Sequence, residues 1–250
     1  MTTGNKRRAL VTGATEGIGL ACASALVRAG VQVLLVGRST AKGERAMAAA
    51  PFAASDSRFY AADLAQADDL RRLFDEIDTR WGRLDIAINN AGIDGASFTP
   101  LTDYPDEAWH QVMALNLTGV YLCMKREIPL MMSSGGAIVN VASIAGLRAS
   151  YTGGCAYTAS KHGLLGLTKS AALEYARHGI RINAVCPGLV RTAMSEAVFG
   201  DKLDEHGDLH PLGRLCEADE VAAAALWLVS PAASFITGVS LPVDGGIMAG

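Results

Sequence analysis

The stretch RALVTGATEGIG, residues 8–19, decides the fold class of this chain. It begins with a short run typical of a buried strand, continues with a glycine-rich turn, and enters a helical pattern at Ile18. Glycines let the backbone approach a pyrophosphate closely, and the N-terminus of the following helix attracts its negative charge. The spacing is G-x3-G-x-G, so it is the order of strand, turn and helix that predicts a dinucleotide-binding corner.

Short β-branched runs alternate with helical segments along the rest of the chain. We expect strands at residues 8–12, 31–36, 58–61, 85–89, 137–141, 180–185 and 239–243. We expect helices at residues 18–29, 41–49, 67–81, 105–132, 156–177 and 218–229. Strands that are apolar on both faces and separated by helices indicate a parallel sheet covered on both sides. The pattern predicts an α/β protein: a single-domain Rossmann fold with a doubly wound parallel sheet of about seven strands and helices on both faces.

The composition favours one compact domain and excludes several function classes. The chain has 250 residues, so we expect residues 1–250 to form a single domain. A net charge of −3, without a long basic run, argues against nucleic-acid binding. The longest purely apolar run, residues 221–229, is about half of the roughly 18 residues that a membrane span needs. Five cysteines without a C-x-x-C pair indicate reduced thiols, so we expect a cytoplasmic protein.

The end of the second predicted strand bears on the choice of dinucleotide. A cofactor with a free adenosine 2′-hydroxyl usually meets an Asp or Glu here, about 20 residues beyond the glycines, whereas an Arg suits a 2′-phosphate. Gly37 occupies the expected acid position and Arg38 follows it. Glu16 acts in the opposite direction, because its carboxylate would repel a 2′-phosphate. The sequence leaves NADP(H) and NAD(H) both open and favours NADP(H).

Tyr157 and Lys161 are a candidate proton-transfer pair. On the helix expected at residues 156–177 they stand four residues apart and share one face. A free tyrosine has a pKa near 10, and a positive charge within about 4–6 Å lowers that pKa by favouring the phenolate. A Y-x-x-x-K pair also occurs in many ordinary helices. Together with a dinucleotide-binding corner, however, the pair predicts a general acid/base.

Motifs that follow the other predicted strands carry a family resemblance. They are, in chain order, Asp63-Leu64, Asn89-Asn90-Ala91-Gly92, Asn116, Ser143, Tyr157-x-x-x-Lys161 and Pro187-Gly188. In this order and spacing the chain resembles the short-chain dehydrogenase/reductase family, from Thr12 to the Asp244-Gly245-Gly246 near its end. The resemblance implies an NAD(P)-binding Rossmann-fold oxidoreductase, a short-chain alcohol dehydrogenase or ketone reductase, which interconverts a secondary alcohol and a ketone by hydride transfer.

The resemblance also implies roles for individual residues. Ser143 is expected to bind the substrate oxygen and Tyr157 to be the acid/base. Lys161 is expected to lower the tyrosine pKa together with the nicotinamide charge and to bind the nicotinamide ribose, while Asn116 holds a water that continues a proton relay. The expected cofactor contacts are Gly13, Thr15, Glu16, Gly17, Ile18, Gly19, Arg38, Asp63, Leu64, Asn90, Ala91, Gly92, Tyr157, Lys161, Pro187, Gly188, Val190 and Thr192.

Residues 192–214 lack a clear period and hold many polar residues and glycines, so we expect a substrate lid rather than a firm helix. His206 and His210 have the i, i+4 spacing of metal ligands, but such a lid would not hold them in register, so we expect no metal site. The largely apolar pocket walls favour a hydrophobic or cyclic substrate. The expected wall residues are Leu147, Tyr151, Met194 and Phe199.

Other function classes share this fold. One is a catalytically silent dinucleotide-binding regulatory or scaffold protein, which the intact Ser143, Tyr157 and Lys161 argue against. Another is an epimerase or dehydratase, which usually needs a larger substrate domain than 250 residues provide. The expected partners are a small-molecule alcohol or ketone and further copies of the chain. The family resemblance implies a homotetramer built on the two long helices and the C-terminal segment.

Overall fold

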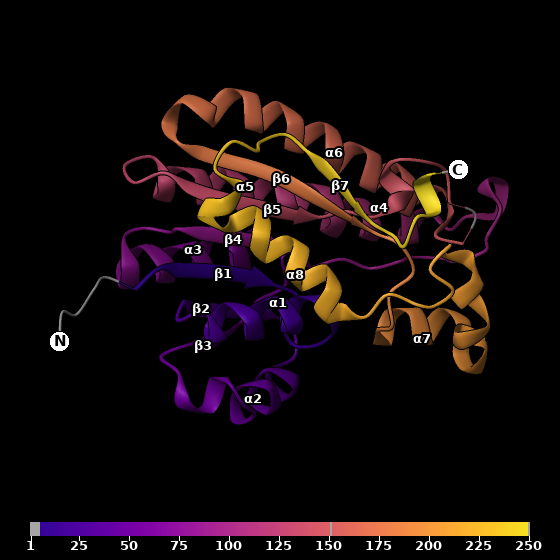
Figure 1. Cartoon of the computed structure of the whole chain (residues 1–250), viewed down its shortest axis with the longest axis horizontal. Coiled ribbons are helices and arrows are strands. Elements are labelled where there is room, and N and C mark those ends of the chain that lie inside the picture. Colours follow the sequence, from indigo (N-terminus) through magenta and orange to yellow (C-terminus); the bar gives the residue numbers. More distant parts are fainter. Residues whose placement is uncertain (1–5, 151, 250) are drawn as a thin grey trace.

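A parallel sheet forms the centre of the computed structural model, which describes residues 6–150 and 152–249 (Figure 1). The strands are β1 (Arg8–Thr12), β2 (Gln32–Gly37), β3 (Arg58–Ala61), β4 (Ile86–Asn89), β5 (Gly136–Val141), β6 (Ile180–Pro187) and β7 (Ser240–Val243). They lie in the order β3-β2-β1-β4-β5-β6-β7. The chain changes direction across the sheet between β1 and β4, which is where ligands bind in open sheets of this kind.

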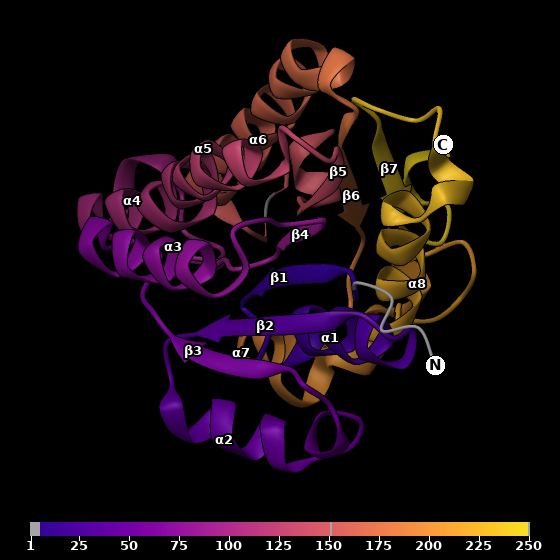
Figure 2. The same ribbon diagram turned by 90° about the vertical axis from the view of Figure 1, so that its left-hand side faces the viewer.

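Helices cover both faces of the sheet. They are α1 (Gly17–Arg28), α2 (Thr40–Ala48), α3 (Ala67–Trp81), α4 (Asp106–Met113), α5 (Val120–Met131), α6 (Gly154–Tyr175), α7 (Ala193–Phe199) and α8 (Ala218–Val229). Figure 2 shows α3, α4, α5 and α6 on one side of the sheet and α1 and α8 on the other. One apolar cluster fills each side. The predicted fold class, a doubly wound parallel sheet of seven strands, is confirmed.

The helix expected at residues 105–132 is divided in the structure. A π-helical turn, Ala114–Gly119, joins α4 to α5 and carries Asn116. The Asn116 side chain bonds to the backbone of Ile93, accepting at Oδ1 from its N–H (2.9 Å) and donating from Nδ2 to its carbonyl oxygen (2.8 Å). Residues 106–131 are nevertheless helical throughout, so the predicted helix is confirmed, and the π turn within it is the feature that the sequence did not show. π turns often mark functional positions, and the hydrophobic period that predicted the helix cannot show a local widening.

Side chains tie the ends of β1 and β4 together at the change of direction. Thr12 Oγ1 accepts hydrogen bonds from the backbone N–H groups of Asn90 (3.0 Å) and Ala91 (3.1 Å). In return, the Asn90 side-chain amide donates to the carbonyl oxygens of Thr12 (3.1 Å) and Gly13 (3.0 Å). These four bonds hold the glycine-rich turn and the loop after β4 in one fixed arrangement, so that both can face the same ligand.

Residues 192–214 are more regular than the sequence indicates. They contain α7 and, directly after it, a 3-10 run over Gly200–Leu209, so the expectation that this segment lacks helix is wrong. Thr192 caps α7: its Oγ1 accepts from the N–H of Ser195 (3.4 Å), and Ser195 Oγ accepts from the N–H of Thr192 (3.0 Å). A helix of 7 residues spans about two turns, which is too short to produce a recognisable period in the sequence.

Candidate active site

A cavity of about 390 Å³ lies among residues that directly follow β4, β5 and β6. Its volume falls in the range of roughly 300–1,000 Å³ that small-molecule sites occupy. It brings together three of the four predicted catalytic residues, Ser143, Tyr157 and Lys161. Apolar side chains form much of the remaining wall: Ile18, Ile144, Leu189, Val190, Met194, Val198, Phe199, Leu209 and Ile247.

Tyr157 and Lys161 lie near the start of α6, as their spacing predicts. Lys161 is only 4 % exposed, and its Nζ donates a hydrogen bond to the carbonyl oxygen of Val141 at the end of β5 (2.9 Å). The same Nζ lies 5.4 Å from the centre of the Tyr157 ring. A Cβ on Gly146 would lie 2.7 Å from the carbonyl oxygen of Lys161, so the turn after Ser143 approaches α6 as closely as only glycine allows. This close packing is what brings β5 and α6 to one site.

Burial dominates the protonation of both groups. It raises the pKa of Tyr157 to about 12; a hydrogen bond with Ser143 lowers that pKa by less, and the charge of Asp94 raises it further. Burial also lowers the pKa of Lys161 to about 8. In the chain without cofactor, the loss of water around the phenolate is the largest influence on the Tyr157 pKa. At neutral pH the Tyr157 phenol is therefore protonated. The lowering expected from Lys161 together with the nicotinamide charge stays a prediction.

Ser143 lies in extended backbone at the start of the 3-10 turn Ile144–Gly146, and its Oγ accepts from the N–H of Ala145 (3.1 Å). Its side chain also lowers the pKa of Tyr157, and both residues line the same cavity. A hydroxyl can donate and accept at once. Two neighbouring hydroxyls, one from β5 and one from α6, can therefore bind one carbonyl or alcohol oxygen between them.

Asn116, the fourth predicted catalytic residue, is buried behind the cavity and is not among the described residues that line it. Besides its bonds to Ile93, its Nδ2 donates to Ser160 Oγ (3.4 Å). A Cβ on Gly92 would lie 3.2 Å from Asn116 Oδ1 and 3.7 Å from Lys161 Nζ. Asn116 Oδ1 and Lys161 Nζ therefore both border the space that a side chain at position 92 would occupy. The water relay expected between them stays a prediction.

A second cavity, of about 270 Å³, lies beside the glycine-rich turn. The turn exposes backbone there because Gly13 (φ +61°) and Gly17 (φ +54°) adopt the left-handed conformation without a side chain. Glu16, at the N-cap of α1, makes no side-chain capping bond, so the first N–H groups of this helix have no side-chain acceptor. Unpaired N–H groups at a helix N-terminus bind phosphate. The turn therefore fits the pyrophosphate of a nicotinamide dinucleotide.

Most predicted cofactor residues other than Tyr157 and Lys161 line one or both cavities: Gly13, Thr15, Glu16, Gly17, Ile18, Arg38, Leu64, Asn90, Ala91, Gly92, Pro187, Gly188, Val190 and Thr192. Gly19 instead packs behind the turn, where a Cβ would overlap the carbonyl oxygen of Gly13. Asp63 is not among the described residues that line either cavity. Its Oδ1 accepts from the N–H of Ala65 (3.1 Å), and its own N–H donates to Asp69 (2.8 Å).

Lys42 is a residue of the second cavity that sequence reasoning missed. Its Nζ donates to both carboxylate oxygens of Glu16 (2.9 and 2.7 Å). Arg38 lines the same cavity, and no ion pair or hydrogen bond engages its side chain among residues 6–150 and 152–249. Lys42 neutralises Glu16, so the three charges together amount to +1. The available signal was Ser39, whose Oγ caps the N–H of Lys42 (3.3 Å) and places the lysine in the first turn of α2.

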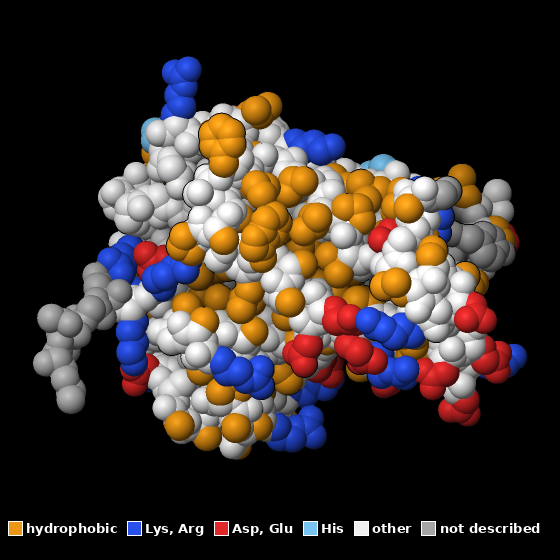
Figure 3. Space-filling view, in the orientation of Figure 1, with side chains coloured by type: hydrophobic (Ala, Val, Ile, Leu, Met, Phe, Trp, Pro, Cys, Tyr) orange, Lys and Arg blue, Asp and Glu red, His pale blue; other side chains and the backbone are white. Residues whose placement is uncertain are grey.

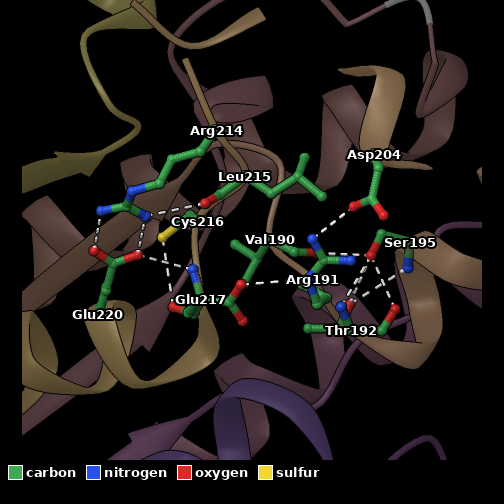
Figure 4. Close-up of polar contacts among 10 residues, drawn as sticks. All are labelled: Val190, Arg191, Thr192, Ser195, Asp204, Arg214, Leu215, Cys216, Glu217 and Glu220. Atoms are coloured by element: carbon green, nitrogen blue, oxygen red, sulfur yellow. Dashed lines mark hydrogen bonds and ion pairs between the residues drawn. The ribbon is translucent and has the colours of Figure 1, made fainter. Parts of the chain in front are cut away.

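Ion pairs anchor both ends of the 192–214 segment (Figure 4). Arg191 pairs with Asp204 (2.6 Å) and Glu217 (3.3 Å), and Arg214 pairs with Glu220 in the first turn of α8 (2.7 Å). Exposed pairs of this kind contribute little to stability individually. The position of these ion pairs is more important than their strength, because they connect the two ends of residues 192–214 to the rest of the protein.

Two of the four expected pocket walls, Met194 and Phe199, line the first cavity. Leu147 does not, because it packs against the apolar cluster beneath α3, α5 and α6. Tyr151 lies outside the described residues. From residues 192–214, α7 and the 3-10 run that follows it contribute Met194, Val198, Phe199 and Leu209 to the apolar wall.

The two histidines of the segment have separate roles. His206 packs its ring against Phe199, with the ring centres 4.5 Å apart. His210 is buried, and its Nε2 accepts from the backbone N–H of Leu189 (3.2 Å). Across residues 6–150 and 152–249, no three His, Cys, Asp or Glu side chains gather in a way that could hold a metal ion.

Comparison with known proteins relates the chain to enzymes named for action on hydroxyl and keto groups. A family model described as enoyl-(acyl carrier protein) reductase matches residues 13–248. The chain is 38 % identical to a 3beta-hydroxysteroid dehydrogenase of Mediterraneibacter gnavus, over 95 % of this chain and 93 % of that one. It is 40 % identical to a 2,5-dichloro-2,5-cyclohexadiene-1,4-diol dehydrogenase of Sphingobium indicum, over 96 % of each chain.

Solved structures show the same architecture. A variant of actinorhodin polyketide ketoreductase with NADPH matches with a TM-score of 0.92 and 33 % sequence identity, and the match covers 99 % of each chain. The likeness therefore extends over the whole fold, including the segments that surround both cavities.

Proposed function

The chain belongs to the short-chain dehydrogenase/reductase family and is a nicotinamide-dinucleotide-dependent oxidoreductase that interconverts a secondary alcohol and a ketone, and we propose that Tyr157 is its acid/base and NADP(H) its preferred cofactor. One observation carries the assignment of Tyr157. Its hydroxyl, the Ser143 hydroxyl and the Lys161 ammonium converge in one largely apolar cavity. Ketone-dependent oxidation of NADPH by the purified protein tests the activity.

In the reduction direction, the ketone oxygen lies between the hydroxyls of Ser143 and Tyr157. Both hydroxyls donate to it, which polarises the carbonyl and favours negative charge on the oxygen. A bound nicotinamide dinucleotide supplies the hydride in this direction and accepts it in the other. Tyr157 then gives its proton to the oxygen. In the oxidation direction Tyr157 takes the alcohol proton instead.

Lys161 supports the phenolate that remains after Tyr157 has given up its proton. An ammonium has three donors, and the described contacts of Lys161 include one acceptor, the carbonyl oxygen of Val141. The other donors are available for the nicotinamide ribose and for a water beside Gly92. Asn116, which borders the same space, holds this water, and the water continues the proton relay.

The charges near β2 support NADP(H), because Lys42 neutralises Glu16 and leaves Arg38 available for a 2′-phosphate. We expect Arg38→Ala to weaken NADPH binding roughly 10- to 100-fold, the usual worth of one charge-assisted hydrogen bond, and to leave NADH binding within about threefold. Fluorescence titration with each cofactor measures both. Arg45→Ala, which replaces an exposed arginine on the neighbouring helix α2, is the matched control. Equal weakening of both cofactors by Arg38→Ala would contradict the NADP(H) assignment.

We also propose that residues 1–250 form one domain in which residues 192–214 are the substrate lid, since Met194, Phe199 and Leu209 from this segment line the substrate cavity. Cytoplasmic location is proposed from the cysteines, which are all free in the structure. Among the described residues, no helix combines the length and apolar character that a membrane crossing requires.

A homotetramer is proposed as the working assembly, and the exposed apolar surface supports it. Figure 3 shows hydrophobic side chains gathered over α6, α8 and β7. Leu173 on α6 is 83 % exposed, Phe235 before β7 is fully exposed, and Trp227 on α8 is also largely exposed. Such a patch on a free surface indicates a protein interface. We expect light scattering at micromolar concentration to give about four times the chain mass of 26.1 kDa. A monomeric mass would refute the tetramer.

A further inference from the structure

Two charged side chains other than Lys161, Asp94 and Arg148, line the substrate cavity. Neither takes part in the proton transfer proposed above. In a cavity with mainly apolar walls, the few polar groups fix the orientation of the ligand and decide its specificity. The position and partners of these two side chains therefore bear on the identity of the substrate.

Asp94 is a carboxylate with an unused acceptor. It lies in the loop after β4, and Ser97 Oγ donates a hydrogen bond to its Oδ2. In the described part of the chain nothing donates to its Oδ1. Burial raises the pKa of Asp94, against a lowering by the Ser97 hydrogen bond. A partly buried carboxylate has lost hydrogen bonds to water, and a single bond from one protein donor does not replace them all. A donor on a ligand would therefore stabilise it.

The loop of Asp94 is joined to a second polar loop of the same cavity. The N–H of Phe98 donates to the carbonyl oxygen of Thr152 (3.1 Å). Ser150 and Thr152 both line the cavity, and their hydroxyls bond to each other (3.1 Å). Polar groups thus come from the two joined loops, whereas residues 192–214 contribute mostly apolar side chains, Met194, Val198, Phe199 and Leu209. The cavity suits a molecule with one polar edge and one apolar face.

The signs of the charges disfavour an ionic substrate. A substrate carboxylate near Asp94 would be repelled by it, and a substrate ammonium would share the cavity with Lys161 and Arg148. A neutral hydroxyl donates to a carboxylate without either repulsion. Asp94 and Tyr157 line the same cavity of about 390 Å³, so one small molecule can reach both.

We propose that Asp94 binds a second hydroxyl group of the substrate, and that the preferred substrates are neutral cyclic diols and the corresponding hydroxyketones. This proposal rests on the function proposed above. The reacting oxygen is bound by Ser143 and Tyr157, the second hydroxyl donates to Asp94, and the ring packs against the apolar side chains of residues 192–214. Asp94 is thus a specificity-determining residue, and it does not take part in the hydride or proton transfer.

The test compares matched pairs of substrates, each a cyclic alcohol and the corresponding diol, such as cyclohexanol and 1,4-cyclohexanediol, with NADP+ as oxidant. The measured quantity is the ratio of kcat/KM for the diol to kcat/KM for the alcohol. We expect this ratio to exceed about ten in the unmodified protein and to fall roughly 10- to 100-fold in Asp94→Ala, since a hydrogen bond to a charged group is lost. A change in the acidity of Tyr157 affects both substrates equally and cancels in the ratio.

Two further variants serve as controls for the Asp94→Ala result. Asp94→Asn keeps the shape of the side chain and one acceptor oxygen, so its ratio should lie between those of the unmodified protein and Asp94→Ala, and it serves if Asp94→Ala does not fold. Asp103→Ala removes an exposed carboxylate that does not line the cavity, and it should leave the ratio unchanged.

The outcomes separate the two proposals. Turnover of cyclic alcohols with a ratio that neither Asp94 variant alters would overturn the role of Asp94 and leave the proposed function standing. Absence of turnover for every alcohol, diol and matching ketone with either cofactor would overturn the proposed function, and the role of Asp94 with it.

Discussion

Replacing Tyr157 by phenylalanine is expected to lower kcat for ketone reduction about a thousandfold, within the range of roughly 10²–10⁴ that one general acid contributes. The substitution removes one oxygen atom and keeps the ring, so packing at the start of α6 is preserved. Cofactor dissociation constants should stay within about threefold. Stopped-flow or steady-state assays with NADPH measure the rate, and fluorescence titration measures the binding.

Tyr175→Phe is the matched control for this variant. Tyr175 is on the same helix, packs partly against the core and is not among the described residues that line either cavity. Its loss of a hydroxyl should leave kcat within about twofold. Turnover by Tyr157→Phe at a rate close to that of the control would exclude Tyr157 as the acid/base and transfer the role to another group of the cavity.

The two reaction directions should differ in their pH dependence. The raised pKa of Tyr157, about 12 in the protein without cofactor, keeps the phenol protonated at neutral pH, so the acid for ketone reduction is present throughout that range. Alcohol oxidation needs the phenolate, whose fraction rises about tenfold per pH unit well below the pKa. Oxidation should therefore accelerate with rising pH in the unmodified protein, and this acceleration should disappear in Tyr157→Phe.

Gly19→Ala is expected to destabilise the protein by about 2–3 kcal/mol and to weaken NADPH binding at least tenfold. The added methyl would overlap the carbonyl oxygen of Gly13 and lie 2.5 Å from Asn90 Nδ2 and 2.8 Å from the Gly13 carbonyl carbon. These atoms form the bonded arrangement that joins the glycine-rich turn to the loop after β4, so they cannot move without breaking it. Urea unfolding and cofactor titration measure the two effects.

The sign of the stability change makes this test decisive. Alanine is a better helix former than glycine by about 1 kcal/mol, so a variant without a steric conflict would be more stable than the original protein. Ala25→Gly, in the same helix, isolates this propensity effect and should cost about 1 kcal/mol while cofactor affinity is kept. A stabilised Gly19→Ala protein that still binds NADPH would show that the turn tolerates a side chain at this position.

The predicted elements agree with the structure wherever a segment is long or strongly patterned. The helices expected at residues 67–81 and 218–229 and the strands at 8–12 and 58–61 have the bounds that the structure gives them. Periodicity failed at α7, whose cap depends on Thr192 and Ser195, and at the π turn of Asn116, which depends on the backbone of Ile93. In both places a specific hydrogen bond, which no hydrophobic pattern reports, decides the local conformation.

The candidate site was predictable to different degrees. The motif positions placed Ser143, Tyr157 and Lys161 in one cavity, because parallel strands end at the same edge of the sheet. The motifs did not reveal that Lys42 neutralises Glu16, nor that Asp94 lines the cavity with an unused acceptor. Lys42 is positioned by the start of α2 and Asp94 by the loop after β4. The spacing of residues along the chain does not predict the contacts that such residues make.

The sequence by itself determined the parallel sheet, the glycine-rich corner and the pairing of Tyr157 with Lys161, since each of these can be predicted from patterns of residues close together in the chain. Only the tertiary structure decided the charge balance at the cofactor cavity, the substrate class suggested by Asp94 and the protonation of Tyr157. Burial and electrostatic energies depend on groups that folding brings within a few ångströms of one another, and the groups around Tyr157 come from three separate strand ends.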